Sequence, residues 1–184
     1  MTFSGGVFFD RDGILIESLV ENGLPVADND LQRLRFVLGA LDVCQSLVEA
    51  NIKMFMITNQ PDISRGKASA AGVRNLNEAV KEKCQLTDVA MCVHDDADGC
   101  DCRKPKSGMI TELAMKHSID LGSSVVVGDR WRDIDAGSDA GCKTLFVNYG
   151  YQESLRSTPT WEVSSMSQAG LILQEFFGLS KKEK

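Results

Sequence analysis

Five short apolar segments recur along the chain, and helical patterns separate them. None of the segments alternates between apolar and polar residues, which is typical of strands covered on both faces of a parallel sheet. They lie at residues 7–9, 53–58, 89–93, 124–127 and 144–147. Between them, apolar side chains fall on helical stripes: Val37, Leu41, Cys44 and Val48, then Val73, Leu76, Ala79 and Val80, then Met109, Ile110, Leu113 and Met115. The alternation predicts an α/β fold with a doubly wound parallel sheet and right-handed crossovers.

The length and pattern of the chain predict a single domain. A chain of 184 residues can bury a sizeable core, and it contains no internal repeat or linker. We expect a single domain over residues 1–179, ending in a helix at 167–177, with an exposed tail at 180–184. The polar stretch 17–30 is long enough for a flap and too short for a second domain, so no large cap domain is predicted.

The charge balance argues against two classes of binding partner. Lys and Arg number 20 against 26 Asp and Glu, which gives a net charge of −6. This balance argues against a general nucleic-acid binder or a membrane-surface binder. The first residues lack the pattern of a signal peptide, and no apolar run approaches the length of a membrane span. We therefore expect a cytoplasmic protein, and a monomer.

Two carboxylates follow the first apolar segment directly, in the sequence Phe-Phe-Asp10-Arg-Asp12-Gly13. Successive side chains of an extended chain point to opposite faces, so Asp10 and Asp12 would share one face. Gly13 indicates a turn at the carboxyl end of the strand, where open α/β sheets bind ligands. One acid could attack a substrate while the other moves a proton. On its own, the pattern is weak evidence, because Asp and Gly more often make ordinary turns.

Polar residues also follow three later segments. Thr58 and the backbone amides after it could bind a phosphoryl oxygen, although a threonine also commonly ends a strand before a turn. Lys104, before a proline, could supply a fixed positive charge for a phosphate, although short basic runs are usually solvated surface. Asp129 could hold a hard cation. Asp133 could buttress Asp129, or could be a first-turn acid favoured by the helix dipole.

In this order the four groups resemble the motifs of the haloacid dehalogenase superfamily of aspartyl phosphotransferases. The resemblance implies a sheet order of 5-4-1-2-3, with the five predicted strands numbered along the chain. It implies that Asp10 is the nucleophile, that Asp12 is the general acid and base with a raised pKa, and that Thr58 and Lys104 bind the transferring group. It also implies Mg²⁺ held by the carboxylates of Asp10 and Asp129 and by the backbone carbonyl of Asp12.

A second metal site is indicated by Cys92, His94, Cys100 and Cys102, which lie within eleven positions. Two Cys/His pairs, each spaced by one residue, can close a loop around tetrahedral Zn²⁺. The alternative is a set of reduced thiols near an exposed histidine. Because Cys102 directly precedes Arg103, the ion would be structural and would order the loop that delivers the basic residues.

This loop resembles that of zinc-bearing capless phosphatases, which act on D-glycero-D-manno-heptose 1,7-bisphosphate or on histidinol phosphate. Segments 58–66 and 128–137 resemble the heptose branch. The five residues between His94 and Cys100, and segment 101–106, resemble the histidinol branch. Segment 14–17 reads Ile-Leu-Ile-Glu, where the heptose branch usually has a Thr and an Asn and then a Gly-Tyr element.

Electrostatics favours a sugar phosphate as the small phosphorylated metabolite. A bisphosphate needs cations away from the metal, whereas histidinol phosphate carries an ammonium that would need acids such as Glu17 or Glu21. We therefore expect a magnesium-dependent phosphatase acting on a heptose bisphosphate. A non-catalytic zinc-stabilised binding module is the alternative from another class, but it would be expected to lack acids that this chain has. The further substrate contacts that we expect are Asn59, Arg65, Arg103 and Arg130, with Lys67 as another candidate cation.

Overall fold

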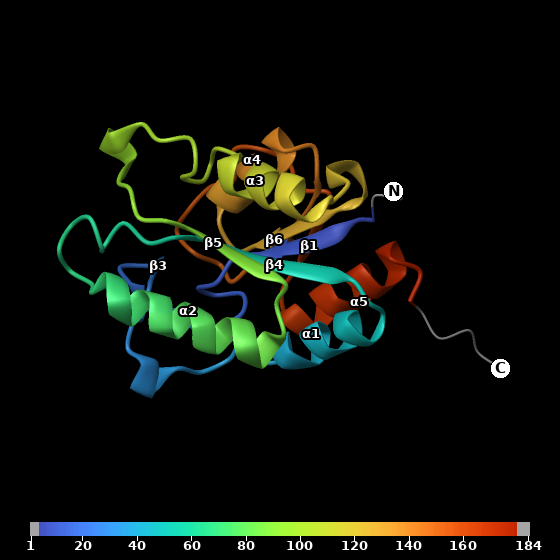
Figure 1. Cartoon of the computed structure of the whole chain (residues 1–184), viewed down its shortest axis with the longest axis horizontal. Helices are drawn as coiled ribbons and strands as arrows, with labels where there is room; N and C mark the ends of the chain where they lie inside the picture. Colours follow the sequence, from blue (N-terminus) through green and yellow to red (C-terminus); the bar gives the residue numbers. More distant parts are fainter. Residues whose placement is uncertain (1–3, 180–184) are drawn as a thin grey trace.

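A six-stranded parallel sheet forms the centre of the computed structural model, which describes residues 4–179 (Figure 1). Its strands lie in the order β5-β4-β1-β6-β7-β8. Their bounds are β1 Gly6–Phe9, β4 Lys53–Asn59, β5 Asp88–Cys92, β6 Val125–Gly128, β7 Lys143–Val147 and β8 Trp161–Val163. The five predicted strands are therefore confirmed in the predicted order 5-4-1-2-3, read from β7 to β5. The edge strand β8 was not predicted, and the proposed tail at 180–184 lies outside the described residues.

The sheet separates two apolar cores because successive side chains of each strand point to opposite faces. In β1, Val7 and Phe9 belong to one core and Phe8 belongs to the other. Neighbouring strands in register repeat this division, since Val7 pairs with Met54 and Val125. This burial on both faces explains why the segments read as continuous apolar runs.

Within residues 4–179, five α-helices cover the two faces of the sheet (Figure 1). Helices α1 (Ala40–Glu49), α2 (Ala70–Cys84) and α5 (Met166–Phe176) pack on the Val7 side, and α3 (Gly108–His117) and α4 (Trp131–Asp139) pack on the Phe8 side. Ser69 caps the start of α2 and Ser165 caps the start of α5, and each side chain accepts a hydrogen bond from a first-turn amide. The assignment of Met115 to the buried stripe is wrong, because it is 77% exposed and Ala114 faces the core instead.

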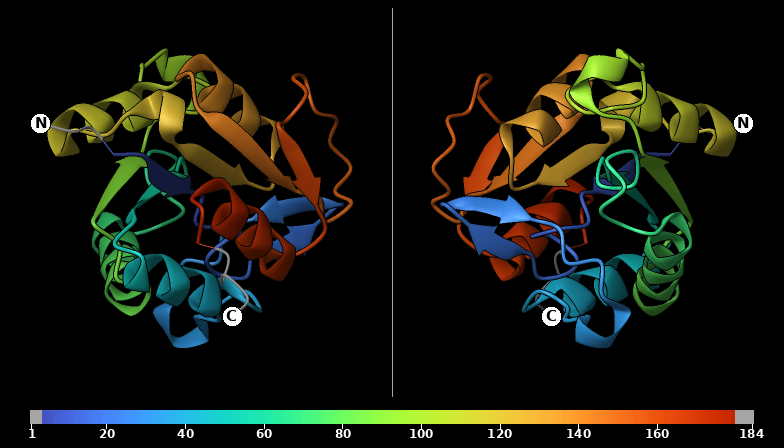
Figure 2. Two further views of the ribbon diagram at one scale, coloured as in Figure 1. Left: turned by 90° about the vertical axis from the view of Figure 1, so that its right-hand side faces the viewer. Right: turned by 90° about the vertical axis from the view of Figure 1, so that its left-hand side faces the viewer.

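The expected flap at residues 17–30 contains a small antiparallel hairpin. Its strands are β2 (Leu19–Glu21) and β3 (Leu24–Val26), and they are separate from the main sheet (Figure 2). The hairpin contacts the loop after β7, where the amide of Gln152 donates to the carbonyl of Gly23 over 3.0 Å. Among the helices of residues 4–179, none combines the length and apolarity needed to cross a bilayer.

Alanine substitution of two helical glycines tests how tightly the helices pack. A Cβ on Gly137 would lie 2.7 Å from Thr144 Cγ2 and 2.9 Å from Val126 Cβ, whereas one on Gly72 would have no neighbour closer than 3.7 Å. We expect Gly137→Ala to lower the free energy of unfolding by about 1–3 kcal/mol through overpacking. Gly72→Ala should raise it by up to about 1 kcal/mol through helix propensity. Urea denaturation measures both, and equal effects of the two substitutions would contradict this packing.

Candidate active site

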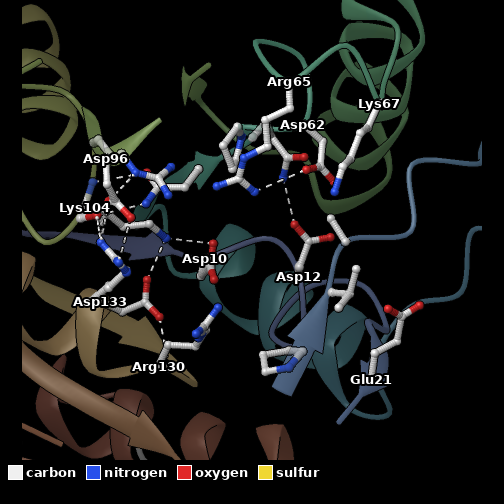
Figure 3. A pocket seen from close by; sticks show the side chains of 18 residues that line it. Asp10, Asp12, Glu21, Asp62, Arg65, Lys67, Asp96, Lys104, Arg130 and Asp133 are labelled. Carbon is white, nitrogen blue, oxygen red and sulfur yellow. Dashed lines mark hydrogen bonds and ion pairs between the residues drawn. The ribbon is translucent and has the colours of Figure 1, made fainter. Parts of the chain in front are cut away.

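The carboxyl ends of three adjacent strands bring the predicted residues together. Asp10 follows β1, Thr58 lies near the end of β4, and Asp129 follows β6. Strand β1 lies between the other two, so these residues meet at one edge of the sheet. Lys104 reaches the same place from the loop between β5 and α3 (Figure 3).

Three carboxylates form a buried cluster at this edge. One oxygen from each of Asp10, Asp129 and Asp133 lies within 4.8 Å of the others. Asp133 Oδ2 accepts a hydrogen bond from the Arg130 amide over 3.1 Å, and Asp133 Oδ1 accepts one from Lys104 over 2.6 Å. Asp133 is therefore a first-turn acid of α4 and a member of the cluster, whereas its buttressing of Asp129 stays a prediction.

Lys104 joins two of these carboxylates. Its ammonium donates to Asp10 Oδ1 over 2.8 Å, to Asp133 Oδ1 and to the carbonyl oxygen of Ile57 over 3.0 Å. Burial lowers the pKa of Lys104, but the charges of Asp10 and Asp133 raise the pKa by more, so Lys104 stays a cation. The expected fixed positive charge is thus present.

The carboxylate of Asp129 has no such partner. Both of its oxygens are buried without a well-formed hydrogen bond from residues 4–179, although the nearby Tyr151 hydroxyl and the Lys104 charge lower the pKa of Asp129 in part. Burial, followed by the charges of Asp10 and Asp133, raises the pKa of Asp129 well above its usual range. A divalent cation bound by carboxylate oxygens would remove this cost, so the donor set fits a hard ion such as Mg²⁺. The expected contribution of the Asp12 backbone carbonyl to this site stays a prediction.

Asp12 lies at the cavity wall, and its carboxylate is not in the cluster. Arg11 forms an ion pair with it over 3.0 Å, and Gln60 Nε2 donates to its Oδ2 over 2.8 Å. Burial raises the pKa of Asp12 most strongly, the Arg11 charge lowers it, and the Asp10 charge raises it again. The net shift is upward, as the sequence predicted, which suits a group that must hold and release a proton.

Two residues that hold Asp12 were not predicted as site residues. Arg11 is fully buried, and its guanidinium also donates to the side chains of Asn77 and Asn29 over 2.8 Å each. Gln60 also donates to Thr58 Oγ1 over 2.8 Å. Their positions beside Asp12 and Thr58 in the sequence were the available signal. The distant partner Asn77 on α2 could not be inferred.

The Asn59 side chain makes two hydrogen bonds with the backbone of Lys104. Its amide nitrogen donates to the carbonyl of Lys104 over 3.0 Å, and its Oδ1 accepts from the Lys104 amide over 3.1 Å. This pair of hydrogen bonds fixes the Lys104 segment to the end of β4. Asn59 also lines the cavity above Asp10, which has a volume of about 460 Å³.

The cysteine and histidine side chains of the second predicted metal site lie close together. The distance from His94 Nδ1 is 3.6 Å to Cys92 Sγ and 3.3 Å to Cys102 Sγ, and the Cys100 sulfur lies 3.4 Å from Cys102 Sγ and 3.7 Å from Cys92 Sγ. In a tetrahedral site with Zn–S bonds of about 2.3 Å, neighbouring ligand atoms lie about 3.5–3.8 Å apart. The four side chains therefore fit a tetrahedral zinc ion.

The basic residues expected to contact substrate line the cavity, and the three arginines among them are each paired with an acid. Arg65 forms two hydrogen bonds with Asp95, and Arg130 forms two with Glu153. Arg103 is paired with Asp96, which also binds a second arginine, Arg132. Arg132 was missed by the sequence analysis, because its partner is 36 positions away.

Comparison with known proteins identifies relatives that agree with one another in their names. A family model described as HAD-hydrolase-like matches residues 101–168. The D-glycero-beta-D-manno-heptose-1,7-bisphosphate 7-phosphatase of Helicobacter pylori strain J99 is 30% identical over 167 residues, which cover 88% of this chain and 91% of the relative. The protein of the same name from Bordetella bronchiseptica is 32% identical over 117 residues, which cover 61% of this chain and 65% of the relative.

Solved structures agree with these relatives. The crystal structure of D,D-heptose 1,7-bisphosphate phosphatase from B. bronchiseptica, complexed with magnesium and phosphate, superposes with a TM-score of 0.79 at 25% identity. The superposition covers 93% of this chain and 99% of that one. A HAD-like phosphatase from Mesorhizobium loti, at 23% identity and a TM-score of 0.77, shares the fold over 99% of this chain and 90% of that one.

Substitution of Asp129 tests whether its carboxylate binds a cation. In a chelator, Asp129→Asn should unfold at the same temperature as the wild type or a higher one, because the substitution removes a buried charge without a partner. Addition of Mg²⁺ at about 100 times its dissociation constant should stabilise the wild type by roughly 2.7 kcal/mol and the variant by much less. Differential scanning calorimetry measures both effects. An equal magnesium-dependent shift in the two proteins would exclude Asp129 as a ligand.

Proposed function

The chain belongs to the haloacid dehalogenase-like hydrolases, and from that premise we propose that it is a magnesium-dependent phosphatase that hydrolyses a heptose bisphosphate through an aspartyl-phosphate on Asp10. The observation that carries this proposal is the buried cluster of Asp10, Asp129 and Asp133, two of whose carboxylates, Asp10 and Asp133, bind the Lys104 ammonium. Phosphoryl transfer requires a fixed nucleophile and compensation of the charge on the phosphoryl oxygens, and these groups supply both.

The hydrogen bonds of Asp10 select its attacking atom. Oδ1 accepts from the Lys104 ammonium over 2.8 Å and from the Arg11 amide over 2.7 Å. No donor from residues 4–179 reaches Oδ2, so Oδ2 is the atom that we assign to attack on phosphorus. Attack forms an Asp10–phosphorus bond and breaks the bond between phosphorus and the sugar oxygen. When bound, Mg²⁺ supplies positive charge that offsets the repulsion between Asp10 and the anionic phosphate.

Asp12 would move the protons of both half-reactions. Its raised pKa lets the protonated acid donate to the departing sugar oxygen. The resulting carboxylate then takes a proton from the water that attacks phosphorus, which releases phosphate and restores Asp10. Arg11 and Gln60 hold the Asp12 side chain in place for both steps.

The substrate assignment is supported by relatives and by charge. The relatives described above are named as heptose bisphosphate phosphatases, and five basic residues besides Lys104 line the cavity. They are Arg65, Lys67, Arg103, Arg130 and Arg132. Histidinol phosphate is the second candidate, and it is favoured by Glu21, which lines the cavity from the hairpin. The ratio of kcat/KM on the two compounds decides which is the substrate. A clear preference for histidinol phosphate would overturn the heptose assignment.

Replacement of the nucleophile tests the covalent mechanism. Asp10→Asn should bring phosphate release from heptose 1,7-bisphosphate below detection, because an amide cannot attack phosphorus in place of the carboxylate. Asp139→Asn, an exposed position on α4, is the matched control and should keep the wild-type rate. Circular dichroism of both variants should match the wild type. Near wild-type turnover by Asp10→Asn would exclude covalent catalysis by this residue.

Metal analysis tests the proposed zinc ion. The purified chain should contain about one zinc, and Cys100→Ser should lose most of it. We also expect kcat/KM to fall by about 10- to 100-fold, because the loop that delivers Arg103 and Lys104 loses its order. Cys142→Ala, a buried cysteine outside this site, should retain the metal. Full zinc content in the Cys100→Ser variant would contradict the assignment.

A further inference from the structure

One carboxylate of the zinc loop (residues 92–102) holds two arginines from different elements. Asp96 Oδ1 accepts from Arg103 Nε over 2.8 Å and from an Arg132 terminal nitrogen over 3.0 Å, and Asp96 Oδ2 accepts from the other Arg132 nitrogen over 3.1 Å. Arg103 follows the loop, whereas Arg132 lies in the first turn of α4. All three side chains line the cavity above Asp10. Figure 3 shows Asp96 with Lys104 on one side of Asp10, and Lys67 with Glu21 on the other.

The charges around the cavity are unevenly compensated. Arg130 faces one carboxylate, whereas Arg65 and Lys104 each face two. Asp96 faces two guanidinium groups, so one positive charge there has no counterpart. Lys67 is the other cavity cation without an ion pair among the described residues. A second anionic group of a substrate would therefore bind at one of these two places.

The donors favour the arginine pair over Lys67. A guanidinium has five N–H donors. Arg132 uses three of them, two on Asp96 and one on the carbonyl of Lys104 at 3.3 Å. Arg103 uses two, on Asp96 and on the carbonyl of His94 at 3.1 Å. Two donors of Arg132 and three of Arg103 thus remain for a ligand, which suits a phosphate group better than a single ammonium does.

The two arginine side chains are also held by their contacts, and they lie apart from the nucleophile. The Arg132 guanidinium lies 4.7 Å from the centre of the Trp131 ring, and the Arg103 side chain is only 10% exposed, so little freedom is lost on binding. Arg132 contacts the Lys104 carbonyl, while the Lys104 ammonium contacts Asp10. One extended lysine side chain therefore separates the pair from the nucleophile. That spacing suits a second group of the same substrate rather than the group being transferred.

We propose that Arg132, oriented by Asp96 and working with Arg103, binds the non-transferred phosphate of a bisphosphate substrate. This inference rests on the proposed function and deepens it, because it assigns the residues that distinguish a bisphosphate from a monophosphate. Asp96 is a positioning residue in this arrangement. The zinc loop then contributes to specificity as well as to the order of Lys104.

The test compares two arginines that stack on the same tryptophan. Arg156 lies 3.4 Å from the centre of the Trp131 ring but does not line the cavity, so Arg156→Ala is a matched control for Arg132→Ala. We expect Arg132→Ala to lower kcat/KM on heptose 1,7-bisphosphate by about 10- to 100-fold. On the same heptose carrying only the 7-phosphate, the loss should be at most about threefold. Arg156→Ala should match the wild type on both compounds.

Binding to an inactive protein gives a second readout. In the Asp10→Asn background, calorimetric titration with the bisphosphate should show a dissociation constant raised about 10- to 100-fold by Arg132→Ala. Equal losses on both substrates, no loss on either, or a bisphosphate-specific loss in Lys67→Ala instead would overturn the inference while leaving the phosphatase intact. A wild-type protein that releases no phosphate from the bisphosphate would overturn the proposed function itself, and this inference with it.

Discussion

The buried ammonium of Lys104 is the contact on which the site depends. Three carboxylates within 4.8 Å of one another would repel strongly in a buried environment. Lys104 binds Asp10 and Asp133 at once and also satisfies the Ile57 carbonyl, while the Asn59 amide fixes its backbone. It offsets part of the negative charge but makes no ion pair with Asp129, whose carboxylate has none within the described part of the chain. This remaining charge explains why the same residues suit a divalent cation and a phosphoryl group.

The sheet order produces this arrangement. Because β1 lies between β4 and β6, the chain brings residues 10, 58 and 129 to one edge although they are far apart in sequence. The loop after β5 adds Lys104, and its four soft ligands lie where a zinc ion could order it. The same loop carries Asp95 and Asp96, whose carboxylates hold three arginines around the cavity. A single loop thus links the proposed phosphoryl site with the arginines around the cavity.

Much of this could be predicted from the sequence, for definite physical reasons. Strands buried on both faces give uninterrupted apolar runs, so β1, β4, β5, β6 and β7 were identified. Strand β8 is three residues long and half-buried, and it gave no such run. The convergence of the residues at the strand ends could also be predicted, because the carboxyl ends of adjacent parallel strands meet at one edge of the sheet. Their partners could not, since Arg11 meets Asn77 and Asp96 meets Arg132 only after the chain has folded.

A crystal structure of the protein with Mg²⁺ and beryllium fluoride, a mimic of a phosphoryl group on a carboxylate, tests the central claim most directly. The expected result is a beryllium adduct on Asp10, with one Mg²⁺ bound by the carboxylates of Asp10 and Asp129 and with Lys104 beside the fluorides. A magnesium ion elsewhere, or an adduct on any other residue, would contradict the convergence of these residues on a single phosphoryl-transfer site.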